Sequence, residues 1–152
     1  MSKKLNYYKD NVDYAWYDSS NIVYSECVDN ENELKTLRIV FSNGSMYEYK
    51  NVHVMDYLVF REDASQGKAL NRLIKEKGYE YQKIDSPNID ELNEKYDFIV
   101  NGGIYLDNSG EKFKVISAVG DILYEYDGKL DEKIAGIITG IFNSININYK
   151  II

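Results

Sequence analysis

The chain has 152 residues, 44% of them hydrophobic, so it can bury the core of one ordinary domain or of two small ones. Its formal net charge of −7 argues against unspecific nucleic-acid binding, which depends on Lys and Arg neutralising phosphates. No apolar run approaches the roughly 20 residues that span a bilayer, no apolar signal core follows the N-terminus, and the single cysteine excludes an intrachain disulfide. We therefore expect a soluble cytoplasmic protein with no membrane partner.

The charge is unevenly distributed along the chain. Residues 1–84 hold 12 basic and 13 acidic side chains, whereas residues 85–152 hold 6 and 12. The three arginines, Arg38, Arg61 and Arg72, all lie in the first part. An anionic ligand is therefore expected to bind there.

The pattern of residues 1–50 predicts an irregular arm followed by three strands. Residues 1–18 are aromatic and polar and are expected to pack as an irregular arm. Residues 21–28 are expected to form a strand, and the alternation over residues 37–42 places Leu37, Ile39 and Phe41 on one buried face. Asn43-Gly44 is typical of a hairpin turn that returns into a strand over residues 46–50, on which Tyr47 and Tyr49 share a face.

Two helices are predicted next, over residues 53–61 and 65–77, followed by a strand over residues 79–84. Gly78 ends the second helix. At 100° per residue that helix has an apolar side and a polar side. The apolar side holds Leu70, Leu73 and Ile74, and the polar side holds Lys68, Asn71, Arg72 and Lys75.

Ser86-Pro87-Asn88 marks a boundary, because the residue before proline is disfavoured in helical geometry. A short helix is predicted over residues 89–95, and a long one is expected to be the main core helix of the second half. Gly136 and Gly140 would let that helix pack closely against a sheet or a partner helix. The predicted strands are 98–100, 104–106, 113–117 and 122–126, and the long helix carries Leu130, Ile134, Ile137, Ile138, Ile141, Phe142 and Ile145.

The fold class predicted is α+β. A domain over residues 1–84, with an antiparallel sheet and two helices, is followed by a smaller, acidic α+β region over residues 88–152, with a hairpin sheet and the long C-terminal helix. Residues 113–126 echo residues 37–49 with one extra residue. The echo indicates either a divergent repeat or the chance likeness of two amphipathic hairpins.

Four signals between Trp16 and Ile84 together resemble the KTSC domain. They are Ser19-Ser20-Asn21-Ile22, Asn43-Gly44, Tyr47-Glu48-Tyr49, and Ser65-Gln66-Gly67-Lys68 with Asn71. The family is known as a module at the C-terminus of some lysyl-tRNA synthetases and as a free-standing protein of bacteria and their viruses, with an RNA-binding role suggested. The resemblance implies the cytoplasm of a bacterium or of a phage-infected bacterial host.

The start of the second predicted helix is the sharpest candidate site. A capping Ser65, with Gln66 and Gly67 in the first turn, would leave backbone N–H groups exposed at the positive end of the helix dipole, beside Lys68. This arrangement predicts an anion cradle. The Walker spacing is absent. Alternatively, Ser65 is only a cap, Gly67 permits close packing and the lysines face water. The complete ligand-binding set predicted is Ser65, Gln66, Gly67, Lys68, Asn71, Arg72, Tyr47, Tyr49 and Arg61.

Tyr47 and Tyr49 could stack a base, as aromatic residues do in single-strand readers. They could equally be core residues, because a strand face must pack against the helices and aromatic residues favour strands for that reason.

Signals for catalysis are weak. His53 has no partner that the sequence can establish, so it is expected to be a surface residue at a helix start. One Cys and one His cannot form a structural zinc site. We expect no catalytic residue, metal or cofactor, although a hydrolase that uses carboxylates alone stays open.

Three functions fit these features. The first is a non-enzymatic protein that captures a small anionic ligand, such as a nucleotide or a nucleotide-derived immune signal, in the manner of a phage anti-defence sponge. The second, implied by the resemblance, is an RNA-binding module related to translation. The third is a protein–protein interaction module. A homo-oligomer is expected.

Overall fold

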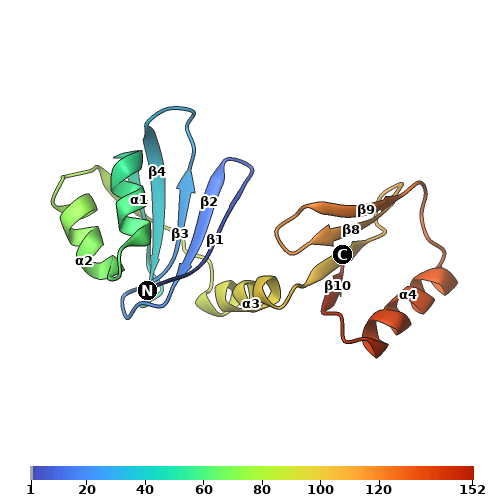
Figure 1. Cartoon of the computed structure of the whole chain (residues 1–152). Coiled ribbons are helices and arrows are strands. Elements are labelled where there is room, and N and C mark those ends of the chain that lie inside the picture. The colour runs from blue at the N-terminus through green and yellow to red at the C-terminus, as the bar shows by residue number, and fades with distance from the viewer. Residues whose placement is uncertain (1) are drawn as a thin grey trace. The chain divides into compact units, whose positions relative to one another are not determined.

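The computed structural model describes residues 2–152 (Figure 1). They form two compact units, the first ending at Asn93 and the second beginning at Glu94. Both units combine helices with a mainly antiparallel sheet, which confirms the α+β fold class.

The first unit is built on a six-stranded antiparallel sheet whose strand order follows the chain, from β1 to β6. The strands are β1 (Lys3–Lys9), β2 (Val12–Tyr17), β3 (Ile22–Val28), β4 (Leu34–Phe41), β5 (Met46–His53) and β6 (Tyr81–Ile84).

The N-terminal segment is a regular hairpin, so the expectation of an irregular arm is wrong. β1 and β2 are joined by Asp10 and Asn11, which adopt positive φ values of 50° and 65°. Asn and Asp tolerate this conformation better than most residues, and hairpin turns of two residues require it. β2 then pairs with β3, and Trp16 is completely buried.

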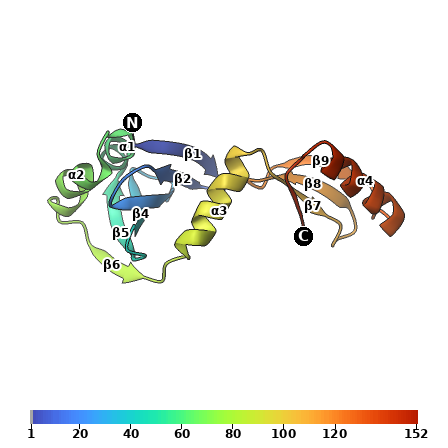
Figure 2. The same ribbon diagram turned by 90° about the horizontal axis from the view of Figure 1, so that it is seen from below.

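Two short helical segments cover one face of this sheet (Figures 1 and 2). They are α1 (Val54–Glu62) and α2 (Gln66–Leu70), and α2 continues into one π-helical segment, η1 (Asn71–Lys75). Leu37 and Ile39 are fully buried beneath them, as the strand alternation predicts. Ile74 faces the same core, whereas Lys68 and Arg72 are exposed, so the two predicted sides of the second helix are confirmed.

The helix α3 (Ile89–Val100) is longer than predicted, and the strand expected over residues 98–100 is wrong. The helix ends at the turn Asn101-Gly102-Gly103, where Gly102 has φ +67°. Gly103 lies so close to the Phe98 ring that a Cβ there would be 2.4 Å from it. This close approach, which sequence periodicity does not report, keeps Phe98 buried at the end of the helix.

The second unit has a sheet of order β10-β7-β8-β9, in which only the β10–β7 pair is parallel. Its elements are β7 (Ile104–Asp107), β8 (Phe113–Ser117), β9 (Ile122–Tyr126), α4 (Glu132–Ser144) and β10 (Tyr149–Ile151).

The long C-terminal helix is not the buried core helix that its apolar residues predict. No residue of α4 is buried. Ala135 and Ile138 turn toward Leu106 and Phe113 of the sheet, with which they line a small apolar cavity. Phe142 is half-buried against Tyr149, whereas Ile134, Ile137 and Ile141 remain at the surface.

The two echoing hairpins have matching cross-strand pairs. Leu37 pairs with Tyr49 and Ile39 with Tyr47, while Phe113 pairs with Tyr126. The extra residue of the second hairpin falls at a register shift in β8–β9. However, β6 joins the sheet beside β5, whereas β10 joins beside β7. A common origin of the halves therefore stays a prediction.

Candidate functional site

Three tyrosines meet at the β6 edge of the first sheet. Tyr47 and Tyr49 of β5 project from the helix-covered face, and Tyr81 of β6 lies opposite Tyr49 in the ladder. The Tyr81 ring centroid is 6.1 Å from that of Tyr47 and 5.8 Å from that of Tyr49. Tyr49 is a core residue, as one alternative predicted, and its burial raises the pKa of its hydroxyl to about 12.

These rings line an open cavity of about 550 Å³, which lies in the size range of small-molecule sites. We call it the aromatic groove. Its rim includes a cation, because the Lys75 Nζ lies 5.7 Å from the centroid of the Phe41 ring. The groove is lined by Phe41, Asn43, Tyr47, Tyr49, Lys75, Gly78, Tyr79 and Tyr81.

Tyr79 is a fixed wall of the aromatic groove. Its hydroxyl donates to Asp56 Oδ2 at 2.5 Å and accepts from the His53 N–H at 3.1 Å. Burial raises the pKa of Tyr79, and its hydrogen bond to Asp56 raises it further. Burial also disfavours the charge on Asp56, but hydrogen bonds from Lys77 and Tyr79 outweigh this effect and lower the pKa of that carboxyl. Tyr79 is thus held in place by hydrogen bonds within the chain.

A second cavity, of about 360 Å³, adjoins the aromatic groove and shares Phe41, Asn43 and Lys75 with it. We call it the polar cavity. A Cβ at Gly67 would lie 3.0 Å from Asn21 Nδ2, so the absence of a side chain at Gly67 gives Asn21 its room. The polar cavity is lined by Asn21, Ile22, Phe41, Ser42, Asn43, Gly67, Leu70, Asn71 and Lys75.

The predicted anion cradle at Ser65 already holds a carboxylate of the chain itself. Ser65 occupies the cap position without a side-chain cap bond, so the predicted serine cap is wrong. Its backbone N–H donates to Asp63 Oδ1 at 2.9 Å, and Arg72 Nη2 donates to Asp63 Oδ2 at 3.1 Å. The two hydrogen bonds, that from Ser65 first, lower the pKa of Asp63. Asp63 therefore brings a negative charge of the chain itself to this helix start.

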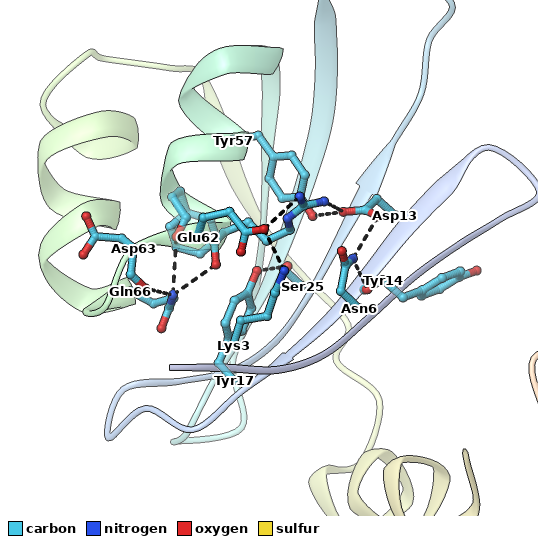
Figure 3. Close-up of polar contacts among 12 residues, drawn as sticks. Lys3, Asn6, Asp13, Tyr14, Tyr17, Ser25, Tyr57, Glu62, Asp63 and Gln66 are labelled. Atoms are coloured by element: carbon cyan, nitrogen blue, oxygen red, sulfur yellow. Dashed lines mark hydrogen bonds and ion pairs between the residues drawn. The ribbon is translucent and has the colours of Figure 1, made fainter. Parts of the chain in front are cut away.

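Gln66 joins the two helices (Figure 3). Its side chain is fully buried, and its Nε2 donates to the carbonyl oxygens of Asp63 at 2.7 Å and Arg61 at 3.3 Å. These contacts satisfy carbonyl groups at the end of α1, where a helix leaves them without internal partners. Gln66 thus has a structural contact and lines neither cavity.

Arg61 likewise lies away from both cavities. Its Nη1 donates to Asp13 Oδ2 at 3.0 Å, and Asp13 also accepts a hydrogen bond from the Tyr57 hydroxyl (Figure 3). Burial alone would lower the pKa of the Arg61 guanidinium, but the hydrogen bond with Asp13 and the charges around it raise it. Arg61 thereby ties α1 to β2.

The structure therefore divides the predicted set of site residues. Tyr47 and Tyr49 line the aromatic groove, and Gly67 and Asn71 line the polar cavity. The remaining predicted residues, Ser65, Gln66, Lys68, Arg72 and Arg61, line neither cavity.

Sequence reasoning missed other lining residues, above all Tyr81, Tyr79 and Lys75. A signal for Tyr81 existed, because residues 79–84 were expected to join the sheet, and a partner strand beside Tyr47 and Tyr49 would bring its own alternating side chains to their face.

The only histidine and the only cysteine of the chain both have structural surroundings. His53 caps α1, accepting the Met55 N–H at Nδ1 over 3.1 Å. Cys27 is buried, which raises the pKa of its thiol to about 12 and disfavours the reactive thiolate. Among residues 2–152, no three His, Cys, Asp or Glu side chains gather as a metal site would require.

The first unit is thus an α+β domain with an open, aromatic-lined groove at one edge of its sheet. Residues 18–84 match the family model of the KTSC domain, which confirms the resemblance predicted for this segment. The β1–β2 hairpin precedes the matched residues and extends their sheet. No curated protein matches the chain, and no helix described for residues 2–152 has the length and apolar character needed to cross a bilayer.

Proposed function

We propose that the first unit is a non-enzymatic binding domain whose aromatic groove holds the base of a small nucleotide. The observation that carries the proposal is the convergence of Tyr47, Tyr49, Tyr79 and Tyr81 on one cavity beside Lys75. Aromatic side chains stack on bases, at roughly 1–3 kcal/mol for each base. Tyr81 is 63% exposed and is therefore accessible to a planar ligand.

The charge of the lining favours a ligand with few negative charges. Lys75 is the only charged residue among those that line the aromatic groove and the polar cavity in the described chain. One ammonium group offsets about one phosphate charge, so a nucleoside monophosphate or a phosphodiester fits better than a triphosphate. The carboxamides of Asn21, Asn43 and Asn71 would donate to phosphate or ribose oxygens.

Capture without turnover is the mode of action that we propose for this domain. A protein that binds a nucleotide without converting it lowers the concentration of that nucleotide available to its receptors. Such capture acts on nucleotides that work as signals, so we propose nucleotide-derived immune signals as the physiological ligand class. Cyclic mononucleotides and cyclic dinucleotides therefore belong in the binding panel. Mass spectrometry of the ligand after incubation should return it unmodified.

Titration calorimetry with nucleosides, nucleoside monophosphates and cyclic nucleotides tests the proposal. Tyr81→Ala should lower the affinity about 5- to 150-fold, because it removes a stacking surface. Tyr8→Ala is the matched control, since Tyr8 is 58% exposed on β1 and lines neither cavity. Equal affinities of the Tyr81 variant and the parent protein would contradict the groove as the site.

Lys75→Gln separates the two ends of the ligand in the same assay. The substitution should lower the affinity for nucleotides but leave the affinity for nucleosides nearly unchanged, because only the phosphate contacts the ammonium group. Lys68→Gln, also exposed on the α2–η1 segment, should change neither. If Lys68→Gln or Arg72→Ala removed binding instead, the helix start at Ser65 would be the site after all.

Oligonucleotides in the panel test the RNA-binding alternative. The affinity for single-stranded RNA would fall steeply with salt concentration. The slope of log K against log salt concentration would drop by about one unit for each lysine removed. Native mass spectrometry of the purified protein distinguishes the cases first. A discrete nucleotide-sized mass supports capture, and heterogeneous oligonucleotides support RNA binding.

A further inference from the structure

The second unit exposes an unusual number of large apolar side chains. Seven of them lie on β9 and α4 and the eighth, Ile145, directly follows α4; each exposes between 45% and 59% of its surface. Isolated exposed apolar residues are ordinary, but a set concentrated on two elements of one small unit marks an interaction surface. We call this set the β9–α4 patch. It consists of Ile122, Leu123, Tyr124, Tyr126, Ile134, Ile137, Ile141 and Ile145.

Tyr124 and Tyr126 of the patch lie on the same side of the sheet as α4, whereas Ile122, which pairs with Ile116 beyond the register shift, and Leu123 lie on the other side. Phe113 lines a cavity with Ala135 and Ile138 of α4, so its side chain points to the helix. Tyr126 lies opposite Phe113 in the β8–β9 ladder and therefore shares that side. Tyr124, two residues before Tyr126, shares it as well. The helix thus leaves the tyrosines of the neighbouring edge strand uncovered.

The two edges of the second sheet differ in how they are protected. Proteins shield free strand edges with short strands and with lysine. β10 has three residues, with Lys150 in the middle. β9 has five, Ile-Leu-Tyr-Glu-Tyr, and contains no lysine. The unprotected edge is therefore the one that borders the exposed apolar surface.

We propose that a second copy of the chain covers the β9–α4 patch, through antiparallel pairing of β9 with β9 about Tyr124. A twofold axis at Tyr124 sets Leu123 opposite Glu125 of the second copy, on the face away from the tyrosines. No two carboxylates then face each other, which would destabilise a strand pair. Glu125 is also neutralised within its own chain by Lys112, at 3.0 Å.

The size of the patch matches what a stable dimer requires. Large aromatic side chains bury roughly 150–250 Å² each, so the six half-exposed patch residues other than Ile122 and Leu123 offer at most roughly 600 Å². Pairing of β9 adds part of Ile122 and Leu123, which brings the total near the roughly 800 Å² per partner of a standard interface. The twofold axis would join the two sheets into one of eight strands and bring both copies of α4 to the same face. Such an isologous pairing closes on itself and stops at the dimer.

Sedimentation velocity of the full chain tests the proposal directly. The expected result is a species of twice the 17.7 kDa chain mass that dissociates on dilution. Tyr124→Cys should then form an intermolecular disulfide under mild oxidation, because the residue meets its own copy at the axis. Met55→Cys is the matched control, with Met55 56% exposed in the first unit, and the natural Cys27 is buried.

Charge variants at Leu123 identify the partner independently of the cysteine result. In Leu123→Lys the ammonium group would lie opposite Glu125 of the second copy, whereas in Leu123→Glu two carboxylates would lie opposite each other. The dimer dissociation constant of the lysine variant should therefore be at least ten-fold lower than that of the glutamate variant. The same pair of substitutions at Met55 controls for net charge and should give equal constants. A monomer at all concentrations, open-ended polymers, or equal constants for the two Leu123 variants would overturn the proposal.

Discussion

At the scale of single residues, Asp13 shows how a charged cluster serves the fold. It accepts hydrogen bonds from Arg61, Tyr57 and Asn6, and its side chain and that of Arg61 are 16% and 18% exposed. Asp13→Asn would leave the guanidinium half-buried without its main counter-charge. We expect the free energy of unfolding to fall by about 2 kcal/mol, somewhat less than for a fully buried pair.

Urea denaturation of both Asp13→Asn and Glu62→Gln checks this expectation. Glu62 also pairs with Arg61 and with Lys3, but its side chain is 46% exposed, so its replacement should cost less than about 0.5 kcal/mol (Figure 3). Equal losses for the two variants would show that burial does not distinguish these ion pairs.

At the scale of elements, the β1–β2 hairpin depends on two residues with positive φ. Asn11, at φ 65°, is followed at once by β2. Asn11→Gly should stabilise the protein by about 0.5 kcal/mol, whereas Asn11→Ala should destabilise it by about 1 kcal/mol, because a Cβ is disfavoured in this conformation. Thermal unfolding of the pair provides its own control, since the two side chains differ by one methyl group. A gain for the alanine variant would contradict the turn.

A comparison of β4 with the β1–β2 hairpin shows which elements can be predicted from sequence patterns. Leu37 and Ile39 alternate with polar residues, and the strand and its buried face follow from that local period. The N-terminal hairpin lacks such alternation, because its tyrosines have both apolar and polar parts, so residues 1–18 were expected to form an irregular arm. Phe98 was assigned to a strand because the residue pattern does not report its close approach to Gly103 at the end of α3.

The candidate site was predictable only in part, for a related reason. Tyr47 and Tyr49 follow from strand alternation, but Tyr81 joins them only through the pairing of β5 with β6. A helix-start motif is visible in the sequence, whereas the neutralisation of that start by Asp63 is visible only in three dimensions. Local patterns predict which groups exist, and tertiary contacts decide which of them are available.

At the scale of the whole molecule, buried tyrosines should limit stability at alkaline pH. Burial raises the pKa of Tyr17, Tyr24 and Tyr57, and that of Tyr49 to about 12. Each folded-state pKa is above the unfolded value of about 10, so these groups contribute stability that is complete below pH 10 and is lost as the pH rises through the folded values. Tyrosinate absorbance should therefore rise in two steps, with exposed residues first and buried ones together with unfolding. A single step near pH 10, with the circular dichroism of the folded state unchanged, would contradict this expectation.

The position of Tyr81 has a consequence for the synthesis of the protein. Every other lining residue of the aromatic groove precedes it in the chain, and it lies on the last strand of the first sheet. A nascent chain therefore emerges from the ribosome with the floor of the groove complete and one wall missing. The aromatic groove is thus completed only late, when β6 pairs with β5, so under the proposed function a chain that ends before Tyr81 would not bind the nucleotide.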